Sequence, residues 1–162
     1  MKHYNTKNYY IEYPFAEFIS ENTKYMKLII EKFIKISHND LISKEKIFLI
    51  CRGSSGAMVS VLFFNALRKK YKDKKFEIMH IKKDGEKSHR ETTFTYEYKN
   101  TDMYIWVDDF ISEGHTLLAC YEKAANHFGD DFKFDYAVCS RINCDKQLIK
   151  HTTKNLVAYD NF

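Results

Sequence analysis

The segment from Tyr104 to Leu117, YIWVDDFISEGHTL, holds the residues best suited to do chemistry. Four apolar residues precede two adjacent acids, Asp108 and Asp109, and a short polar loop with one glycine then opens a helix. Two carboxylates at the end of a buried strand repel each other unless a cation or hydroxyl donors satisfy them. The start of a helix offers unpaired N–H groups and a partial positive charge, which suit a phosphate. The segment therefore predicts a site for a phosphorylated pentose beside a magnesium ion.

The predicted phosphate loop, residues 112–116, comes directly before a helix predicted from Leu117 to Phe128. Gly114 permits backbone conformations that other residues resist, and the hydroxyls of Ser112 and Thr116 can donate further hydrogen bonds. A Ser/Thr helix cap with a turn glycine is a plainer interpretation of the same residues. The adjacent acids favour the ligand site over the plain cap.

Two other segments carry groups that suit a dense anion. CRGSSGA, residues 51–57, ends an apolar strand-like run, and its Arg52 offers a guanidinium fork beside exposed amides. KKDGEKSHR, residues 82–90, is a basic segment with a glycine and a histidine between two predicted strands. Each has an alternative interpretation, the first as a tight turn and the second as a solvated hairpin tip.

The elements that position these segments are predicted from periodicity. Apolar residues from Phe15 to Ile36 have helical spacing, with a break near Asn22 that would divide them into two helices, and residues 57–67 form another helix. Strands are predicted at Lys46–Cys51, Phe76–Ile81, Thr92–Tyr98, Met103–Val107, Phe134–Cys139 and Leu156–Tyr159. This order predicts an α/β fold with an open, mostly parallel sheet flanked by helices and an antiparallel hairpin at residues 92–98. Because ligands bind beyond the carboxyl ends of such strands, the site loops should face one crevice.

Composition bounds the class of protein. The chain has 162 residues, 44% hydrophobic and 16% aromatic, which indicates one domain, 1–162, with a sizeable core. No apolar run approaches the roughly 20 residues of a membrane span, and the first residues lack the apolar core of a signal peptide. We therefore expect a cytoplasmic protein with no membrane partner. The four cysteines lack zinc or disulfide spacing, and the basic run RKKYKDKK at residues 68–75 suits either a solvated face or an anionic partner.

The acidic segment resembles the phosphoribosyl-pyrophosphate binding motif of type I phosphoribosyltransferases. It shares the family's four apolar residues, two acids, two apolar residues and short Ser/Thr/Gly loop. Glu113 departs from the motif, which usually has a small or hydroxylated residue there, and an inward carboxylate would repel phosphate. We therefore expect the Glu113 side chain to face solvent while backbone amides bind the phosphate.

Two weaker matches accompany this motif. RGSSG is similar to the family's pyrophosphate loop, especially the Arg-Gly form in xanthine and hypoxanthine-guanine enzymes. KKDGEKSHR resembles the mobile catalytic loop of orotate phosphoribosyltransferases, with spacing that differs by one residue. The resemblance covers roughly Lys46 to Arg141 and implies a five-stranded parallel core, residues 46–162, with a helical hood or cover at residues 1–45. Aromatic residues of the hood that could stack a base are Tyr9, Tyr10, Tyr13 and Phe15.

The resemblance also implies a role for each candidate site residue. Asp108 and Asp109 would hold the ribose hydroxyls and Mg²⁺, directly or through water; Arg52 and Gly53 would hold pyrophosphate; Lys83, Lys87 and His89 would close over it; Ser112, Glu113, Gly114, His115 and Thr116 would bind the 5-phosphate; and Arg141 would contact the base.

The implied activity belongs to nucleotide metabolism: a nucleobase displaces pyrophosphate from phosphoribosyl pyrophosphate. The Arg-Gly loop and Arg141 favour a 6-oxopurine, as in purine salvage, whereas the basic segment and the hood favour orotate. Two alternatives remain, a regulator that binds a nucleotide or phosphoribosyl pyrophosphate without turnover and an enzyme that cleaves a nucleotide glycosidic bond. We expect no nucleic-acid partner, because a clear aromatic and basic RNA motif is missing. Dimers are common in the family, so a homodimer is the oligomer that the resemblance implies, while the sequence itself leaves the state open.

Overall fold

The carboxyl ends of parallel strands form one edge of the molecule, and the predicted site loops follow three of these strands. The computed structural model describes residues 15–83, 85 and 94–160. Within these ranges the helices are α1 (Phe15–Ser43), α2 (Gly53–Lys70), α3 (His115–Phe128) and α4 (Lys146–Thr152). The strands are β1 (Lys46–Arg52), β2 (Lys75–Ile81), β3 (Met103–Val107), β4 (Phe110–Ile111), β5 (Phe134–Ile142) and β6 (Thr153–Asp160).

The main sheet has the strand order β2-β1-β3-β5-β6, and each neighbouring pair is parallel. The short strand β4 continues beyond β3 and pairs with the end of β5, also in parallel. The predicted open parallel α/β sheet is therefore confirmed. Parallel neighbours end at the same edge, so the loops after β2, β1 and β3 lie next to one another.

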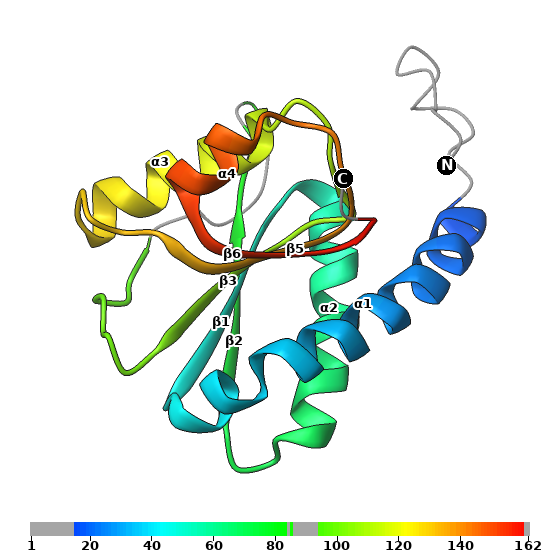
Figure 1. Ribbon diagram of the computed structural model, residues 1–162, viewed down its shortest axis with the longest axis horizontal. Helices are drawn as coiled ribbons and strands as arrows, with labels where there is room; N and C mark the ends of the chain where they lie inside the picture. Colours follow the sequence, from blue (N-terminus) through cyan, green and yellow to red (C-terminus); the bar gives the residue numbers. More distant parts are fainter. Residues whose placement is uncertain (1–14, 84, 86–93, 161–162) are drawn as a thin grey trace.

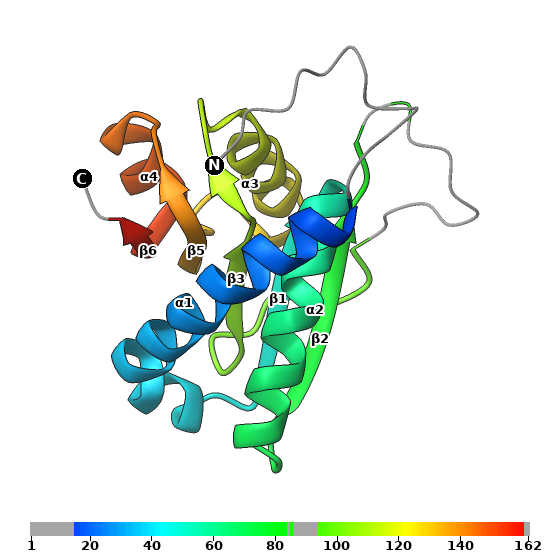
Figure 2. The same ribbon diagram turned by 90° about the vertical axis from the view of Figure 1, so that its right-hand side faces the viewer.

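Helices cover both faces of the sheet, with α1 and α2 on one face and α3 and α4 on the other (Figure 1, Figure 2). Side chains alternate along β3, as the pleat of a strand requires. Ile105 and Val107 join the core under α1 and α2, whereas Tyr104 and Trp106 join the core under α3. None of the four is more than 1% exposed, which explains the unbroken apolar run before the acid pair.

Helix α1 is longer and more regular than predicted. It runs without interruption from Phe15 to Ser43, so the predicted break near Asn22 is wrong. Apolar residues at helical spacing, including Met26, Ile29 and Phe33, are buried and hold the helix against the sheet. Burial of this stripe over several turns makes one continuous helix the favourable arrangement.

The middle of α1 lies beside the carboxyl end of β6. The rings of Tyr25 and Tyr159 meet edge to face, with their centroids 5.6 Å apart. Lys32 Nζ donates to the Ala158 carbonyl of β6 at 2.7 Å. The predicted base-stacking residues Tyr9, Tyr10 and Tyr13, and the side chain of Phe15, lie outside the described residues.

The predicted strand at Thr92–Tyr98, and with it the antiparallel hairpin, is wrong. Residues 94–98 form no strand, and residues 92 and 93 lie outside the described residues. The Phe94 ring stacks on His127 of α3 at 5.3 Å between centroids, and the Tyr96 carbonyl accepts a hydrogen bond from His127 Nε2 at 2.7 Å. The alternating aromatic residues thus pack against α3 and the sheet, which produces a strand-like pattern without a strand partner.

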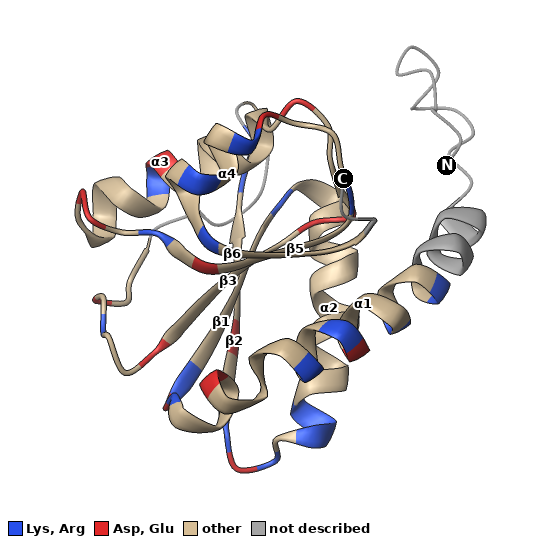
Figure 3. Cartoon of the chain, viewed as in Figure 1, with Lys and Arg blue, Asp and Glu red and all other residues tan. Residues whose placement is uncertain are grey.

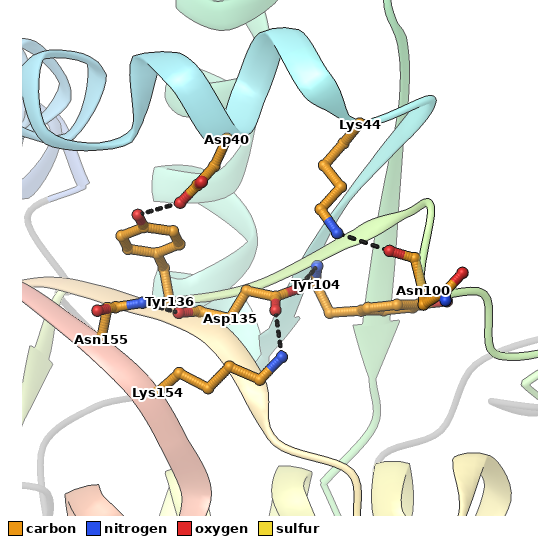
Figure 4. Close-up of polar contacts among 8 residues, drawn as sticks. All are labelled: Asp40, Lys44, Asn100, Tyr104, Asp135, Tyr136, Lys154 and Asn155. Carbon is orange, nitrogen blue, oxygen red and sulfur yellow. Dashed lines mark hydrogen bonds and ion pairs between the residues drawn. The ribbon is translucent and has the colours of Figure 1, made fainter.

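The amino-terminal edge of the sheet, opposite the predicted site, is held by polar contacts (Figure 4). The Asp135 carboxylate accepts hydrogen bonds from the Tyr104 N–H and from Lys154 Nζ, each at 2.8 Å. The Tyr136 hydroxyl donates to Asp40 Oδ2 of α1 at 2.6 Å. Burial, and then the hydrogen bond to Asp40, raise the pKa of Tyr136, so its hydroxyl remains a donor at neutral pH. These contacts tie β3, β5, β6 and α1 together.

The basic run at residues 68–75 lies at this same amino-terminal edge, where α2 ends and β2 begins (Figure 3). Lys74 Nζ donates to the carbonyls of Ile42 and Lys44 at 2.5 and 2.8 Å. Lys74 therefore satisfies backbone acceptors at the end of α1. The run as a whole lies across the molecule from the predicted site and does not contribute to it.

Candidate functional site

The acid pair occupies an interruption in the sheet between β3 and β4. Val107 lies opposite Val138, and Phe110 lies opposite Arg141, so the chain crosses the interruption without an extra residue. The Asp108 N–H donates to the Val138 carbonyl at 3.1 Å. Asp108 and Asp109 therefore sit at the carboxyl end of β3, as predicted, and their main chain is held by β5.

Both acids are buried, with Asp108 5% and Asp109 7% exposed. The Asp109 N–H donates to Asp108 Oδ1 at 2.9 Å. Burial raises the pKa of Asp108 well above its usual value, and the neighbouring Asp109 carboxyl raises it further, while the Lys83 ammonium acts in the opposite direction. The pair is thus costly to ionise fully without a cation or hydroxyl donors, which is the property that the sequence predicted.

The RGSSG segment is not a separate tight turn, because Gly53 is already the first residue of α2. Gly53 has a φ of +74°, and a Cβ there would lie 2.8 Å from Lys83 Cε and 3.2 Å from its Nζ. Arg52 Nε donates to the Lys82 carbonyl at 3.3 Å, and His80 Nε2 donates to the Gly53 carbonyl at 3.3 Å. These two hydrogen bonds therefore join the junction of β1 and α2 to the end of β2 and the residue that follows it.

The first turn of α2 also approaches the acid pair. A Cβ on Gly56 would lie 3.4 Å from Asp108 Oδ1 and 3.7 Å from the Val107 carbonyl. Sequence reasoning gave Gly56 no role, although its place in RGSSG was a signal for close approach of a helix. Gly53, Lys83 and Asp108, which follow three adjacent strands, are thus brought together at one edge.

The predicted phosphate loop leads directly into α3. Gly114 precedes the helix with a left-handed φ of 88°, and no side chain of the described residues caps this helix start. The plainer interpretation, a Ser/Thr side-chain cap, is therefore wrong. The Leu118 N–H donates to the Gly114 carbonyl at 2.9 Å as the first turn closes. The N–H groups at the start of α3 have no carbonyl one turn earlier in the helix to accept from them. They can therefore donate hydrogen bonds to a bound anion.

Glu113, the one departure from the motif, lies on the solvent side of this loop. Its Oε2 is 2.8 Å from His115 Nε2, and the two side chains are 78% and 82% exposed. The Glu113 side chain therefore faces solvent, as expected, and it pairs there with His115. Ser112 is also exposed and Thr116 is half-buried.

Helix α4, which the sequence did not predict, supports the loop from behind. A Cβ on Gly114 would lie 2.1 Å from Leu148 Cδ2 and 3.5 Å from Cys144 Cβ. Asp145 begins α4 and its Oδ1 accepts from the Gln147 N–H at 2.8 Å, a regular helix cap. Leu148 of α4 therefore fills the space that any residue other than glycine would need at position 114.

The remaining predicted residues divide into two groups. Arg141 is the second-last residue of β5, is exposed, and has Phe110 and Asp160 as its neighbours on the two adjacent strands. It thus lies near the carboxyl edge of the sheet, two residues beyond the predicted end of the strand. Lys87 and His89 lie outside the described residues.

The donor set bears on the predicted magnesium ion. No group of three or more His, Cys, Asp or Glu side chains able to hold a metal occurs in the described part of the chain. Asp108 and Asp109 alone fit Mg²⁺, which often takes one or two carboxylates together with water and substrate phosphates. These two carboxylates would bind the ion only together with water and substrate oxygens.

Two further predictions bear on the class of protein. No helix in the described ranges is long and apolar enough to cross a membrane. The four cysteines are free; burial raises the pKa of Cys51 to about 11 and that of Cys120 to about 12, which keeps both as thiols.

Neither a protein family model nor a curated protein matches the chain.

Proposed function

We propose that the protein is a magnesium-dependent phosphoribosyltransferase in which a nucleobase displaces pyrophosphate from phosphoribosyl pyrophosphate. The observation that carries the proposal is the meeting of Gly53, Lys83 and Asp108 at the carboxyl edge of three adjacent strands. These groups are 30 and 25 positions apart in the chain (83 − 53 and 108 − 83). A cationic side chain over an Arg-Gly loop, next to buried acids, suits a sugar that carries a diphosphate.

Each part of the substrate has a corresponding part of the site. The open start of α3 at residues 114–117 would receive the 5-phosphate through backbone amides. Asp108 and Asp109 would accept hydrogen bonds from the ribose hydroxyls. Arg52 and Lys83 would face the diphosphate, and the base would enter from the side of Arg141. In this proposal the chain has the type I phosphoribosyltransferase fold, with residues 1–45 as its hood.

The protein's part in the reaction is positional and electrostatic. The bond from C1 of the sugar to the leaving oxygen breaks ahead of bond formation to the base nitrogen. Positive charge then grows on the ribose ring, near the acid pair, and negative charge grows on pyrophosphate, near Arg52 and Lys83. Asp108 and Asp109, together with substrate oxygens, would hold Mg²⁺. The ion would neutralise part of the diphosphate charge. The proton lost by the base nitrogen goes to solvent or to the leaving pyrophosphate.

A second candidate, binding without turnover, is favoured by one observation: Glu113 adds a carboxylate to the phosphate loop. The test is incubation with Mg²⁺, phosphoribosyl pyrophosphate and a panel of purine and pyrimidine bases, read as pyrophosphate release with and without each base. Base-dependent release supports the transferase. Tight binding without release would favour the regulator, and release of free base from a nucleotide would favour glycosidic cleavage. Failure to bind phosphoribosyl pyrophosphate would overturn the proposal.

A further inference from the structure

Ser140 of β5 contacts the main chain of the acid pair through two groups. Its N–H donates to the Asp109 carbonyl at 2.8 Å, and its hydroxyl donates to the same oxygen. Ser140 is only 6% exposed, so water competes little for the hydroxyl. One residue thus supplies two donors to one carbonyl, which has two lone pairs to receive them.

These contacts fall within the interruption between β3 and β4, where the acid pair needs support. On its amino side, Asp109 donates its N–H to Asp108 Oδ1 at 2.9 Å. On its carbonyl side, it is held by Ser140. Both peptide groups that flank Asp109 are therefore fixed. Because the rotamers open to a side chain depend on its backbone dihedrals, fixing these peptide groups limits the directions that the Asp109 carboxyl group can take.

We propose that Ser140 is a positioning residue that holds Asp109 in the orientation needed for the ribose hydroxyls. The proposal rests on the transferase function proposed above. A hydroxyl with only a structural role would contribute stability, whereas a positioning hydroxyl also contributes to rate. Small displacements of a charged group from the reacting atoms reduce the rate steeply.

Ser140→Ala removes the hydroxyl but keeps the N–H bond, and Ser37→Ala is a matched control. Ser37 is completely buried in α1, and its hydroxyl donates to the Phe33 carbonyl at 2.7 Å. This bond lies within α1, one turn before Asp40, which accepts from Tyr136 at the edge of the sheet opposite the candidate site. We expect both variants to lose similar stability, while kcat falls about tenfold to a hundredfold in Ser140→Ala alone.

Amide hydrogen exchange, resolved by residue, provides a second readout that needs no substrate. Ser140→Ala should accelerate exchange of the Asp109 amide selectively, and Ser37→Ala should leave it unchanged. Equal kcat in the two variants, or unchanged exchange at Asp109 in Ser140→Ala, would overturn the positioning role. If the wild-type protein transfers no phosphoribosyl group, the proposed function fails, and exchange alone then decides whether Ser140 holds Asp109.

Discussion

Gly114→Ala tests how the phosphate loop is built, because two separate costs meet at this residue. The alanine would have to hold a φ of 88° and would place its Cβ 2.1 Å from Leu148 Cδ2. Left-handed backbone costs an L-residue about 1–2 kcal/mol. Leu148 is half-buried and must move away, which loses part of the about 1.5–3 kcal/mol that full burial of a leucine contributes. We expect a total loss of about 2–3 kcal/mol in the free energy of unfolding.

The chain offers a control that separates the two costs. Gly85 has a similar φ of 79°, but a Cβ there meets none of the described atoms within 4 Å. Gly85→Ala should therefore show the backbone cost alone, about 1–2 kcal/mol. In a Leu148→Ala background the contact is absent, and Gly114→Ala should then cost about the same as Gly85→Ala.

Urea unfolding with linear extrapolation measures all five proteins, namely the wild type, the three single variants and the double variant. A loss in Gly114→Ala no larger than that in Gly85→Ala would refute the reasoning, because it would mean that Leu148 does not close on the loop. An unchanged cost of Gly114→Ala in the Leu148→Ala background would refute it as well. Calorimetric titration with phosphoribosyl pyrophosphate should show weaker binding by Gly114→Ala, since the displaced loop carries the amides of the proposed phosphate site.

Three further predictions concern the acids. Asp109→Asn should abolish pyrophosphate release while the melting temperature stays within a few degrees of the wild type; unchanged activity would point to a structural role. Asp108 has a raised pKa when folded, so wild-type stability should fall by up to about 1.4 kcal/mol per pH unit above about pH 4, until the folded pKa is passed. Asp108→Asn should therefore be more stable than the wild type at pH 8, with an advantage that shrinks toward pH 4; an equal advantage at both values in urea unfolding would contradict this. Glu113→Thr should change the Kd for phosphoribosyl pyrophosphate by less than about threefold, since Glu113 pairs with His115 on the surface, and tightening of tenfold or more in calorimetry would mean that the carboxylate faces inward.

The parts of the fold that could be predicted from the sequence are those with a local signal. Strands buried on both faces leave unbroken apolar runs, and β1 and β3 begin at the predicted residues, Lys46 and Met103. The acid pair follows directly from the end of such a run. Its position at the carboxyl edge could therefore be predicted before any contact between strands was known.

The parts that were missed depend on contacts between distant segments. Residues 94–98 alternate because their rings pack on His127 and neighbouring aromatics, and a period of two residues does not distinguish that from a strand. The passage of Lys83 over Gly53, and the fit of Leu148 against Gly114, leave no pattern within either segment. Ser140 had one weak signal, its place immediately after the predicted end of β5.

The acid pair itself suggests what the ligand must bring. Asp108 is buried, and the cation that favours its ionised form is Lys83, which also lies over the proposed diphosphate loop. A diphosphate that attracts Lys83 would weaken this support and leave a buried carboxyl less well compensated, which is costly. A ligand that carries Mg²⁺ replaces the lost positive charge. We therefore expect pyrophosphate to bind at least about tenfold more weakly in excess chelator than in Mg²⁺. This ratio should shrink in Asp108→Asn, where one of the two buried carboxylates is gone. Calorimetric titration of both proteins under both conditions measures the two ratios, and equal ratios in wild type and variant would show that Asp108 and the bound diphosphate do not share a cation.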